Sequence, residues 1–171
     1  MTATQPPLIE ILNPGLLTTI QDKGRLGWQE QGVSVSGAAD LNSMMVANSL
    51  VGNDGDAPVI EFVMLAPTLF FSRDCVIAFT GADFSFTIDD VPLPHGRPIK
   101  IFAGSILKGG RSYRGVYGYL SIYGVVCVDK VMGSVATDTG NHFGGIAGRK
   151  FKTSDTTVSY THLTLPTIVD V

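Results

Sequence analysis

The segment PVIEFVMLAPTLFFSRDCVIAFTG (residues 58–81) decides the fold class, because it holds three short apolar runs separated by turn residues. The runs are VIEFVML, TLFF and CVIAFTG, and the breaks between them contain Pro67 and Asp74. Short runs rich in Val, Ile, Phe and Thr between Pro, Gly and Asp are typical of β-strands. The segment therefore predicts three consecutive strands.

The same alternation of short apolar runs and turns continues on both sides. Upstream, residues 7–13 end at Asn13-Pro14-Gly15, which suits a type II turn, and residues 16–22 form a second run. Downstream, similar runs reach residue 131. Gly occupies 20 of 171 positions, roughly 12% against a usual ~7%. Many short strands at close spacing predict a mainly β protein, either a barrel or a sandwich.

One stretch has helical instead of strand periodicity. Residues 40–51 place apolar side chains at three- and four-residue spacing, Asp40 is suited to cap the N-terminus, and Gly52-Asn53 is a typical stop. We predict one short helix over residues 40–51.

Composition excludes several classes of function. The net charge is −3 and no basic run exceeds two residues, which argues against nucleic acid or an anionic membrane as a partner. The N-terminus lacks a signal-peptide pattern and no run approaches a membrane span, so we expect a cytoplasmic protein. The three His residues have no metal-ligand spacing, and no metal site is predicted. Cys75 and Cys127 lie in apolar runs and are expected to be buried reduced thiols.

The segment TTIQDKGRLGWQEQGVSVSGAAD (residues 18–40) interrupts the strand pattern, since it is polar and rich in Gly. In one interpretation it is a loop that holds a small amide- or phosphate-bearing substrate, because glycines admit a ligand and a helix start offers free N–H groups. In the other it is a structural loop that satisfies its own backbone. The candidate site residues are Gln21, Asp22, Gly24, Arg25, Ser36 and Gly37.

A second polar segment, MGSVATDTGNHFGGIAGRKF, spans residues 132–151. Its Ser, Thr and Gly content permits an anion-binding nest of backbone N–H groups, although such loops are more often only turns. The candidate site residues here are Ser134, Thr137, Asp138, Gly144 and Gly145.

Several blocks together resemble the allophanate hydrolase subunit 2 family. They are PGLLTTIQDKGRLGWQEQGVSVSGAAD, ANSLVGN, IEF, FTGAD and, further on, GS with TD and FGGIAGR. That family includes the C subunit of 5-oxoprolinase and the matching part of the carboxyltransferase domain of biotin-dependent urea carboxylase. The resemblance covers only the N-terminal half of a usual family member, and it implies a cyclophilin-like β-barrel.

The resemblance also implies a function. We expect an enzyme: a subunit of an ATP-dependent 5-oxoprolinase complex, a hydrolase that opens a cyclic amide to form glutamate and that is inactive as an isolated fragment. Asp22 and Arg25 are its expected catalytic residues. The implied partners are an allophanate hydrolase subunit 1-like protein (the B subunit of 5-oxoprolinase) and a lactam-utilisation subunit. Two alternatives stay open: a biotin-dependent urea carboxylase part, or a non-enzymatic module that modulates a sensor kinase.

Two features depart from the family pattern. Val135 and Ala136 stand where members usually carry an Arg and a Ser, and Ser154 replaces a usual Gly. The end of the chain, SYTHLTLPTI, resembles translated adapter sequence. We therefore expect residues 1–157 to be the truncated N-terminal part of the family domain and residues 158–171 to be a non-native tail.

Overall fold

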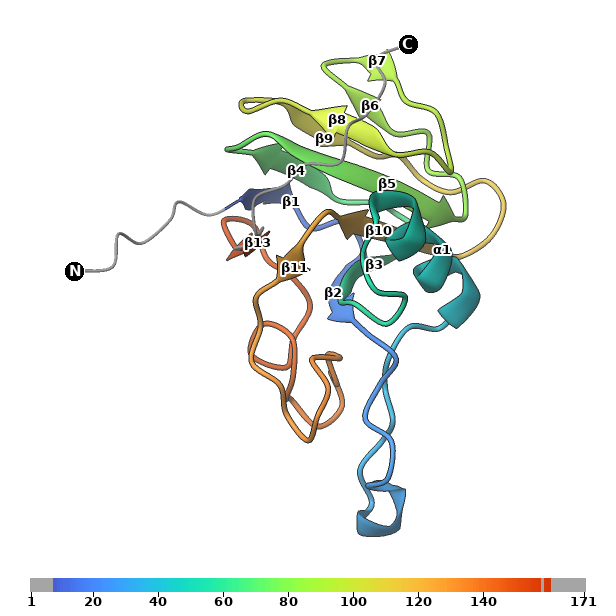
Figure 1. Ribbon diagram of the computed structural model, residues 1–171, viewed down its shortest axis with the longest axis vertical. Coiled ribbons are helices and arrows are strands. Elements are labelled where there is room, and N and C mark those ends of the chain that lie inside the picture. Colours follow the sequence, from blue (N-terminus) through green and yellow to red (C-terminus); the bar gives the residue numbers. More distant parts are fainter. Residues whose placement is uncertain (1–7, 158, 161–171) are drawn as a thin grey trace, which may run out of the picture.

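The computed structural model describes residues 8–157 and 159–160 and consists of two antiparallel sheets, a two-stranded ribbon and one α-helix (Figure 1). The six-stranded sheet has the order β12 (Thr156–Thr157), β1 (Ile9–Asn13), β4 (Thr68–Phe71), β9 (Ile106–Lys108), β6 (Thr87–Ile88) and β7 (Val91–Pro92). The five-stranded sheet has the order β2 (Leu17–Gln21), β3 (Val59–Val63), β10 (Tyr117–Ile122), β5 (Cys75–Gly81) and β8 (Ile99–Ile101). The ribbon pairs β11 (Val125–Val126) with β13 (Ser159–Tyr160). The predicted mainly β class is confirmed.

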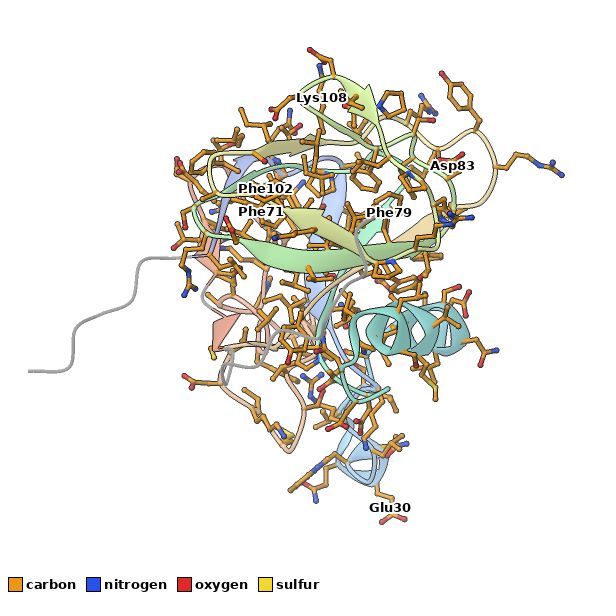
Figure 2. All side chains as sticks on the ribbon, turned by 45° about the horizontal axis from the view of Figure 1, so that its top comes forward. Glu30, Phe71, Phe79, Asp83, Phe102 and Lys108 are labelled. Carbon is orange, nitrogen blue, oxygen red and sulfur yellow. The ribbon has the colours of Figure 1, made fainter. Side chains whose placement is uncertain are left out.

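The main core lies between the two sheets. Alternate residues of each strand point into it, as the two-residue period of a strand requires. Ile60 and Phe62 of β3 and Ile77 and Phe79 of β5 meet side chains from the six-stranded sheet such as Phe71. Figure 2 shows Phe71 and Phe79 inside this layer. The core therefore holds the two sheets face to face.

The other face of the five-stranded sheet is covered by α1 (Leu41–Val51), which packs on β5 and β10. Asp40 caps the helix by accepting from Ser43 N–H at 3.1 Å, and Gly52 ends it in the left-handed conformation. The helix predicted over residues 40–51 is confirmed. Because α1 lies over β5 and β10, these two strands are buried on both faces of the sheet.

A buried polar group lies beneath the start of α1. Glu61 of β3 is 7% exposed and accepts from Ala39 N–H at 2.8 Å, while the Tyr119 hydroxyl accepts from Asp40 N–H at 2.7 Å and hydrogen-bonds Glu61. Burial raises the pKa of the Glu61 carboxyl, against the lowering effect of its hydrogen bonds from Ala39 N–H and the Tyr119 hydroxyl. The backbone that enters α1 is thus held by side chains of the sheet.

The predicted barrel is not closed by strand pairing. No ladder among the described residues joins an edge of one sheet to an edge of the other. The free edge of β2 is covered instead by single hydrogen bonds, from Thr137 N–H to Ile20 O and from Phe151 N–H to Thr18 O. The covering segment is rich in turns and positive-φ glycines, so it cannot form a continuous strand. Mainly β with two sheets is the fold observed, and barrel closure is not detected.

Most of the expected non-native tail lies outside the described residues. Only Ser159–Tyr160 of residues 158–171 is described, as strand β13 paired with β11. The expectation that residues 158–171 are a non-native tail stays a prediction. Separately, α1 is too short to cross a membrane, and no other helix in residues 8–157 and 159–160 could do so.

The raised pKa of Glu61 leads to a test of pH-dependent stability. Folding favours the protonated carboxyl, so its stabilising effect is complete below the unfolded pKa and is lost as pH rises through the folded pKa. Glu61→Gln does not ionise, so its free energy of unfolding should rise relative to wild type between about pH 4 and about pH 7. Urea unfolding at both pH values measures this. Glu30→Gln, at the exposed tip seen in Figure 2, is the control and should show no such change. A pH-independent difference for Glu61→Gln would contradict the interpretation.

Candidate functional site

The connection between β2 and α1 projects from the body as a narrow arm, residues 22–40, with the short 3-10 helix η1 (Gln29–Gln31) at its tip (Figure 1). Arg25 N–H donates to Val35 O and Ala38 N–H donates to Asp22 O, both at 2.9 Å. A Cβ on Gly24 would lie 2.7 Å from Val35 O. The predicted site residue Gly24 therefore lets the two sides of the arm meet; Gly37 lies against Gly24 in the same way.

Residues 131–151 form a second loop, the 131–151 loop, which packs against the base of the arm. Asp22 joins the two. Its Oδ1 accepts from Gly24 N–H at 2.8 Å and from the Ser134 hydroxyl at 2.6 Å, and its Oδ2 accepts from Val135 N–H at 2.8 Å. Asp22 and Ser134, which were predicted separately as site residues, are thus in direct contact. Both are buried, and their hydrogen bonds go to protein.

Arg25 lies in the same junction and is only 1% exposed. Its Nη2 donates to Ala136 O, its Nε lies 3.5 Å from Val131 O, and its guanidinium stands 4.6 Å from the Phe143 ring centroid. Nη1 has no hydrogen-bond partner within the described part of the chain. The structure directs the guanidinium of Arg25 at backbone carbonyls of the 131–151 loop, and the expected catalytic role of Arg25 stays a prediction.

The remaining polar candidates extend the same junction. Gln21 Nε2 donates to Thr137 O at 3.3 Å, and the Thr137 hydroxyl donates to Ile20 O at 2.9 Å. The Ser34 hydroxyl donates to Asp138, and it lies 3.1 Å from the Ser36 hydroxyl. These contacts tie β2 and the arm to the 131–151 loop.

The Asp138 carboxyl is surrounded by hydrogen-bond donors. Burial would raise its pKa, but hydrogen bonds from the Ser34 hydroxyl, the Asn141 side chain and the Asn141 and Gly140 N–H groups outweigh burial and hold the pKa below its usual range. The N–H groups of the predicted nest therefore already surround a carboxylate of the protein.

Gly144 and Gly145 are required for close packing. A Cβ on Gly144 would lie 2.1 Å from Ala136 O, and a Cβ on Gly145 would lie 2.0 Å from the Thr137 hydroxyl oxygen. Both residues have positive φ, at 71° and 51°. The structure brings the predicted candidates from both segments into one junction, and their role toward a substrate stays a prediction.

A cavity of about 760 Å³ lies beside this junction. Asp22, Val135 and Gly145 contribute to its wall from the junction side. The other charged lining residues come from the arm, from the turn after α1 and from the segment after β11. They are Lys23, Asp54, Asp56, Asp129 and Lys130. The sequence analysis did not predict residues 54–56 and 129–130 as site residues. The feature that could have indicated them is that charged residues cluster in turns next to strands and a helix end.

The cavity combines hydrogen-bond acceptors and donors. Lys23 Nζ pairs with Asp56 Oδ2 at 2.6 Å, which raises the pKa of Lys23 and lowers that of Asp56. Asp54, Asp129 and Lys130 lie at the lining without an ion pair among the described residues. No group of His, Cys, Asp and Glu in the described chain could hold a metal ion. A ligand with both N–H and C=O groups matches such a lining.

The cysteines differ from their predicted setting in one respect. Cys75 is buried, and burial raises the pKa of its thiol to about 12. Cys127 is exposed and lines the cavity, so the expectation that both thiols are buried is wrong. The cause is that strand β11 ends at Val126, one residue before it.

The burial of Arg25 predicts a loss of stability on substitution. Lys lacks the planar fork and cannot reproduce the contacts to Val131 O, Ala136 O and the Phe143 ring. Arg25→Lys should lower the free energy of unfolding by about 1–3 kcal/mol. Denaturant unfolding measures this loss. Arg97→Lys, an exposed site, should leave stability unchanged. An Arg25→Lys protein of wild-type stability would show that the guanidinium does not hold the junction.

Comparisons with known proteins place this geometry in a family. A model of the carboxyltransferase domain, subdomain A and B, matches residues 31–162. Urea amidolyase of Saccharomyces cerevisiae is 40% identical over 152 residues, which are 88% of this chain and 8% of that protein. The C subunit of 5-oxoprolinase from Escherichia coli is 37% identical over 148 residues, which are 86% of this chain and 48% of that protein.

A solved structure supports the same family assignment. The crystal structure of the Kluyveromyces lactis urea carboxylase superposes with a TM-score of 0.89 at 34% identity, over 94% of this chain and 14% of that one. The chain thus spans about half of the 5-oxoprolinase subunit it matches and a small part of the urea-processing enzymes. The match to the family model covers most of the chain, including the 131–151 loop and part of the arm. This chain belongs to the carboxyltransferase domain family, subdomains A and B, as the resemblance in its sequence predicted.

Proposed function

We propose that this chain is part of a subunit of an ATP-dependent 5-oxoprolinase complex, an enzyme that hydrolyses a cyclic amide to glutamate in the cytoplasm. The cavity beside the junction carries the proposal, because it offers donors and acceptors to one small molecule. The match to the E. coli 5-oxoprolinase C subunit over 86% of the chain supports it. The proposed partners are a protein like the B subunit of 5-oxoprolinase and a lactam-utilisation subunit.

The lining residues suggest how a lactam would bind. Asp54 and Asp129 are acceptors for the ring N–H, and Lys130 is a donor for the ring carbonyl or the substrate carboxylate. Asp22 is engaged by three protein donors and so fixes the wall instead of contacting the ligand. The chain's contribution is then to position the amide and to stabilise charge at its carbonyl oxygen.

The cavity does not fit ATP. Its lining holds four aspartates (Asp22, Asp54, Asp56 and Asp129) against two lysines (Lys23 and Lys130), which disfavours a triphosphate. In this proposal, ATP therefore binds to another part of the complex, and no step at this cavity depends on ATP.

A second candidate is the carboxyltransferase part of a biotin-dependent urea carboxylase. The 40% identity to yeast urea amidolyase and the TM-score of 0.89 to the K. lactis urea carboxylase favour it. Urea also suits an acidic lining, since it has N–H donors on both nitrogens and no carboxylate. Carboxyl transfer would require biotin as a cofactor, whereas the 5-oxoprolinase proposal does not require biotin.

Exchange of the matched segment distinguishes the two candidates. In one chimera, this chain replaces the 148 matched residues of the E. coli 5-oxoprolinase C subunit; in another, it replaces the 152 matched residues of yeast urea amidolyase. The first, assembled with its E. coli partner subunits, should hydrolyse ATP in response to 5-oxoproline, whereas the second should not carboxylate urea. The reverse outcome would establish the second candidate. The 171-residue chain alone should show no 5-oxoprolinase activity.

Lys130 provides a residue-level prediction. In the active chimera, Lys130→Met should lower kcat/KM for 5-oxoproline by roughly tenfold or more, the order of one hydrogen bond to a charged group. The melting temperature should not change, because Lys130 is exposed. Lys108→Met, an exposed lysine on β9 outside the cavity lining, is the matched control. Equal kinetics in both variants would remove Lys130 from the site.

A further inference from the structure

A polar side chain lies on the buried face of α1, where packing alone would favour an apolar one. Asn48 is 0% exposed and shares this face with Met44, Ala47 and Val51. Asn has a low helix propensity, and a buried amide costs free energy unless its hydrogen bonds are made. A residue that departs from the local pattern in this way indicates a specific role for its hydrogen bonds.

The Asn48 amide holds the turn that follows α1. Its Nδ2 donates to Gly55 O at 3.1 Å and to Ala57 O at 2.8 Å, the two carbonyls on either side of Asp56. The turn itself is closed by Ala57 N–H, which donates to Asp54 O at 2.9 Å. Asp54 and Asp56 line the cavity, whereas Asn48 does not. Asn48 therefore fixes the backbone that carries two of the lining carboxylates.

A second amide extends the hydrogen bonds to the turn between β10 and β11. The Ser121 hydroxyl, also 0% exposed, donates to Asn48 Oδ1 at 2.6 Å and accepts from Asn53 Nδ2 at 3.2 Å. Asn53 Nδ2 also donates to Ile122 O at 2.8 Å, and its Oδ1 accepts from Gly124 N–H at 3.0 Å. Gly124 directly precedes β11, and the segment after β11 supplies further lining residues.

We call Asn48, Asn53 and Ser121 the amide network. Both amides use their Nδ2 groups and their Oδ1 atoms, and the Ser121 hydroxyl between them fixes which way each amide faces. A buried network with all its hydrogen bonds made favours one geometry, because any rearrangement leaves a polar group unsatisfied.

The ion pair at the cavity cannot replace the amide network in holding this turn. Lys23 Nζ lies 2.6 Å from Asp56 Oδ2, but the two side chains are 59% and 51% exposed. Exposed ion pairs contribute little, because water screens them and both side chains lose entropy on pairing. The position of Asp56 is thus set mainly from beneath, by Asn48, and the ion pair follows from that position.

We propose that Asn48 is a positioning residue for the cavity ligand, and that it acts through the amide network on Asp54, Asp56 and the segment after β11. The inference rests on the proposed function in one respect, which is that Asp54 accepts the ring N–H of a lactam. A displaced acceptor weakens a hydrogen bond that is already present in the bound substrate, so the Michaelis constant is the quantity that should change.

The first test uses the 171-residue chain and needs no activity. The hydrogen bond and charge of Lys23, with a smaller effect of Lys130, lower the pKa of Asp56. Asn48→Leu removes the donor to Gly55 O and Ala57 O, so the pKa of Asp56, followed by carboxyl-carbon NMR, should rise toward its ordinary range. The matched control is Thr80→Val, which removes another buried hydrogen bond to α1, from the Thr80 hydroxyl to Ser43 O at 2.7 Å, away from the cavity. It should leave the pKa of Asp56 unchanged.

The second test uses the E. coli C-subunit chimera with its partner subunits. Asn48→Leu should raise KM for 5-oxoproline roughly tenfold, the order of one hydrogen bond to a charged group, with kcat within about twofold of wild type. Thr80→Val should leave KM within about twofold. Ser121→Ala, which removes the donor to Asn48 Oδ1, should change both readouts in the same direction as Asn48→Leu by a smaller factor.

Several results would overturn the proposal. One is an Asp56 pKa, or a KM in an active chimera, that Asn48→Leu leaves unchanged; another is an equal change in Thr80→Val, which would reduce Asn48 to a stabilising residue of α1. If circular dichroism shows Asn48→Leu unfolded, Ser121→Ala decides on the same two readouts, and no change there contradicts the proposal. A raised Asp56 pKa together with an inactive chimera would refute the proposed function and retain the amide network as the element that sets the cavity wall.

Discussion

The carboxylate of Asp22 is the interaction on which the site depends. It is buried at the end of β2 and accepts hydrogen bonds from its own arm through Gly24 and from the 131–151 loop through Ser134 and Val135. Asp22 and Ser134 are 112 residues apart in sequence. A buried carboxylate that lost these donors would face the full cost of desolvation, so the two segments are held to one geometry.

The junction around Asp22 explains why so many polar and glycine residues are concentrated in these two segments. Arg25 directs its guanidinium at carbonyls of the 131–151 loop, and Asp138 collects donors from Ser34 and Asn141. Gly144 and Gly145 allow backbones to approach where any Cβ would collide. The Asp22 carboxylate is satisfied by protein donors and forms part of the cavity wall, whereas the other charged lining residues lie outside this junction.

The molecule thus separates two tasks in space. The core between the sheets provides stability, and the junction forms one wall of the cavity. Such a division suits a family whose relatives include a named subunit and segments of very large enzymes. Under the proposed function, a small amide substrate needs only a few donors and acceptors from this chain. The remaining chemistry is then carried out by neighbouring parts of the assembly.

The sequence by itself determined the mainly β class, the helix after Asp40 and the family, because strand period, helix capping and motif order are local properties of the chain. It also marked the two segments that meet. Only the tertiary structure decided that Asp22 and Arg25 contact the 131–151 loop, that Lys130 and Asp129 line the cavity, and that strand pairing leaves the barrel open. These outcomes depend on contacts between residues far apart in the chain, and local sequence patterns carry no information about which distant donor reaches which acceptor.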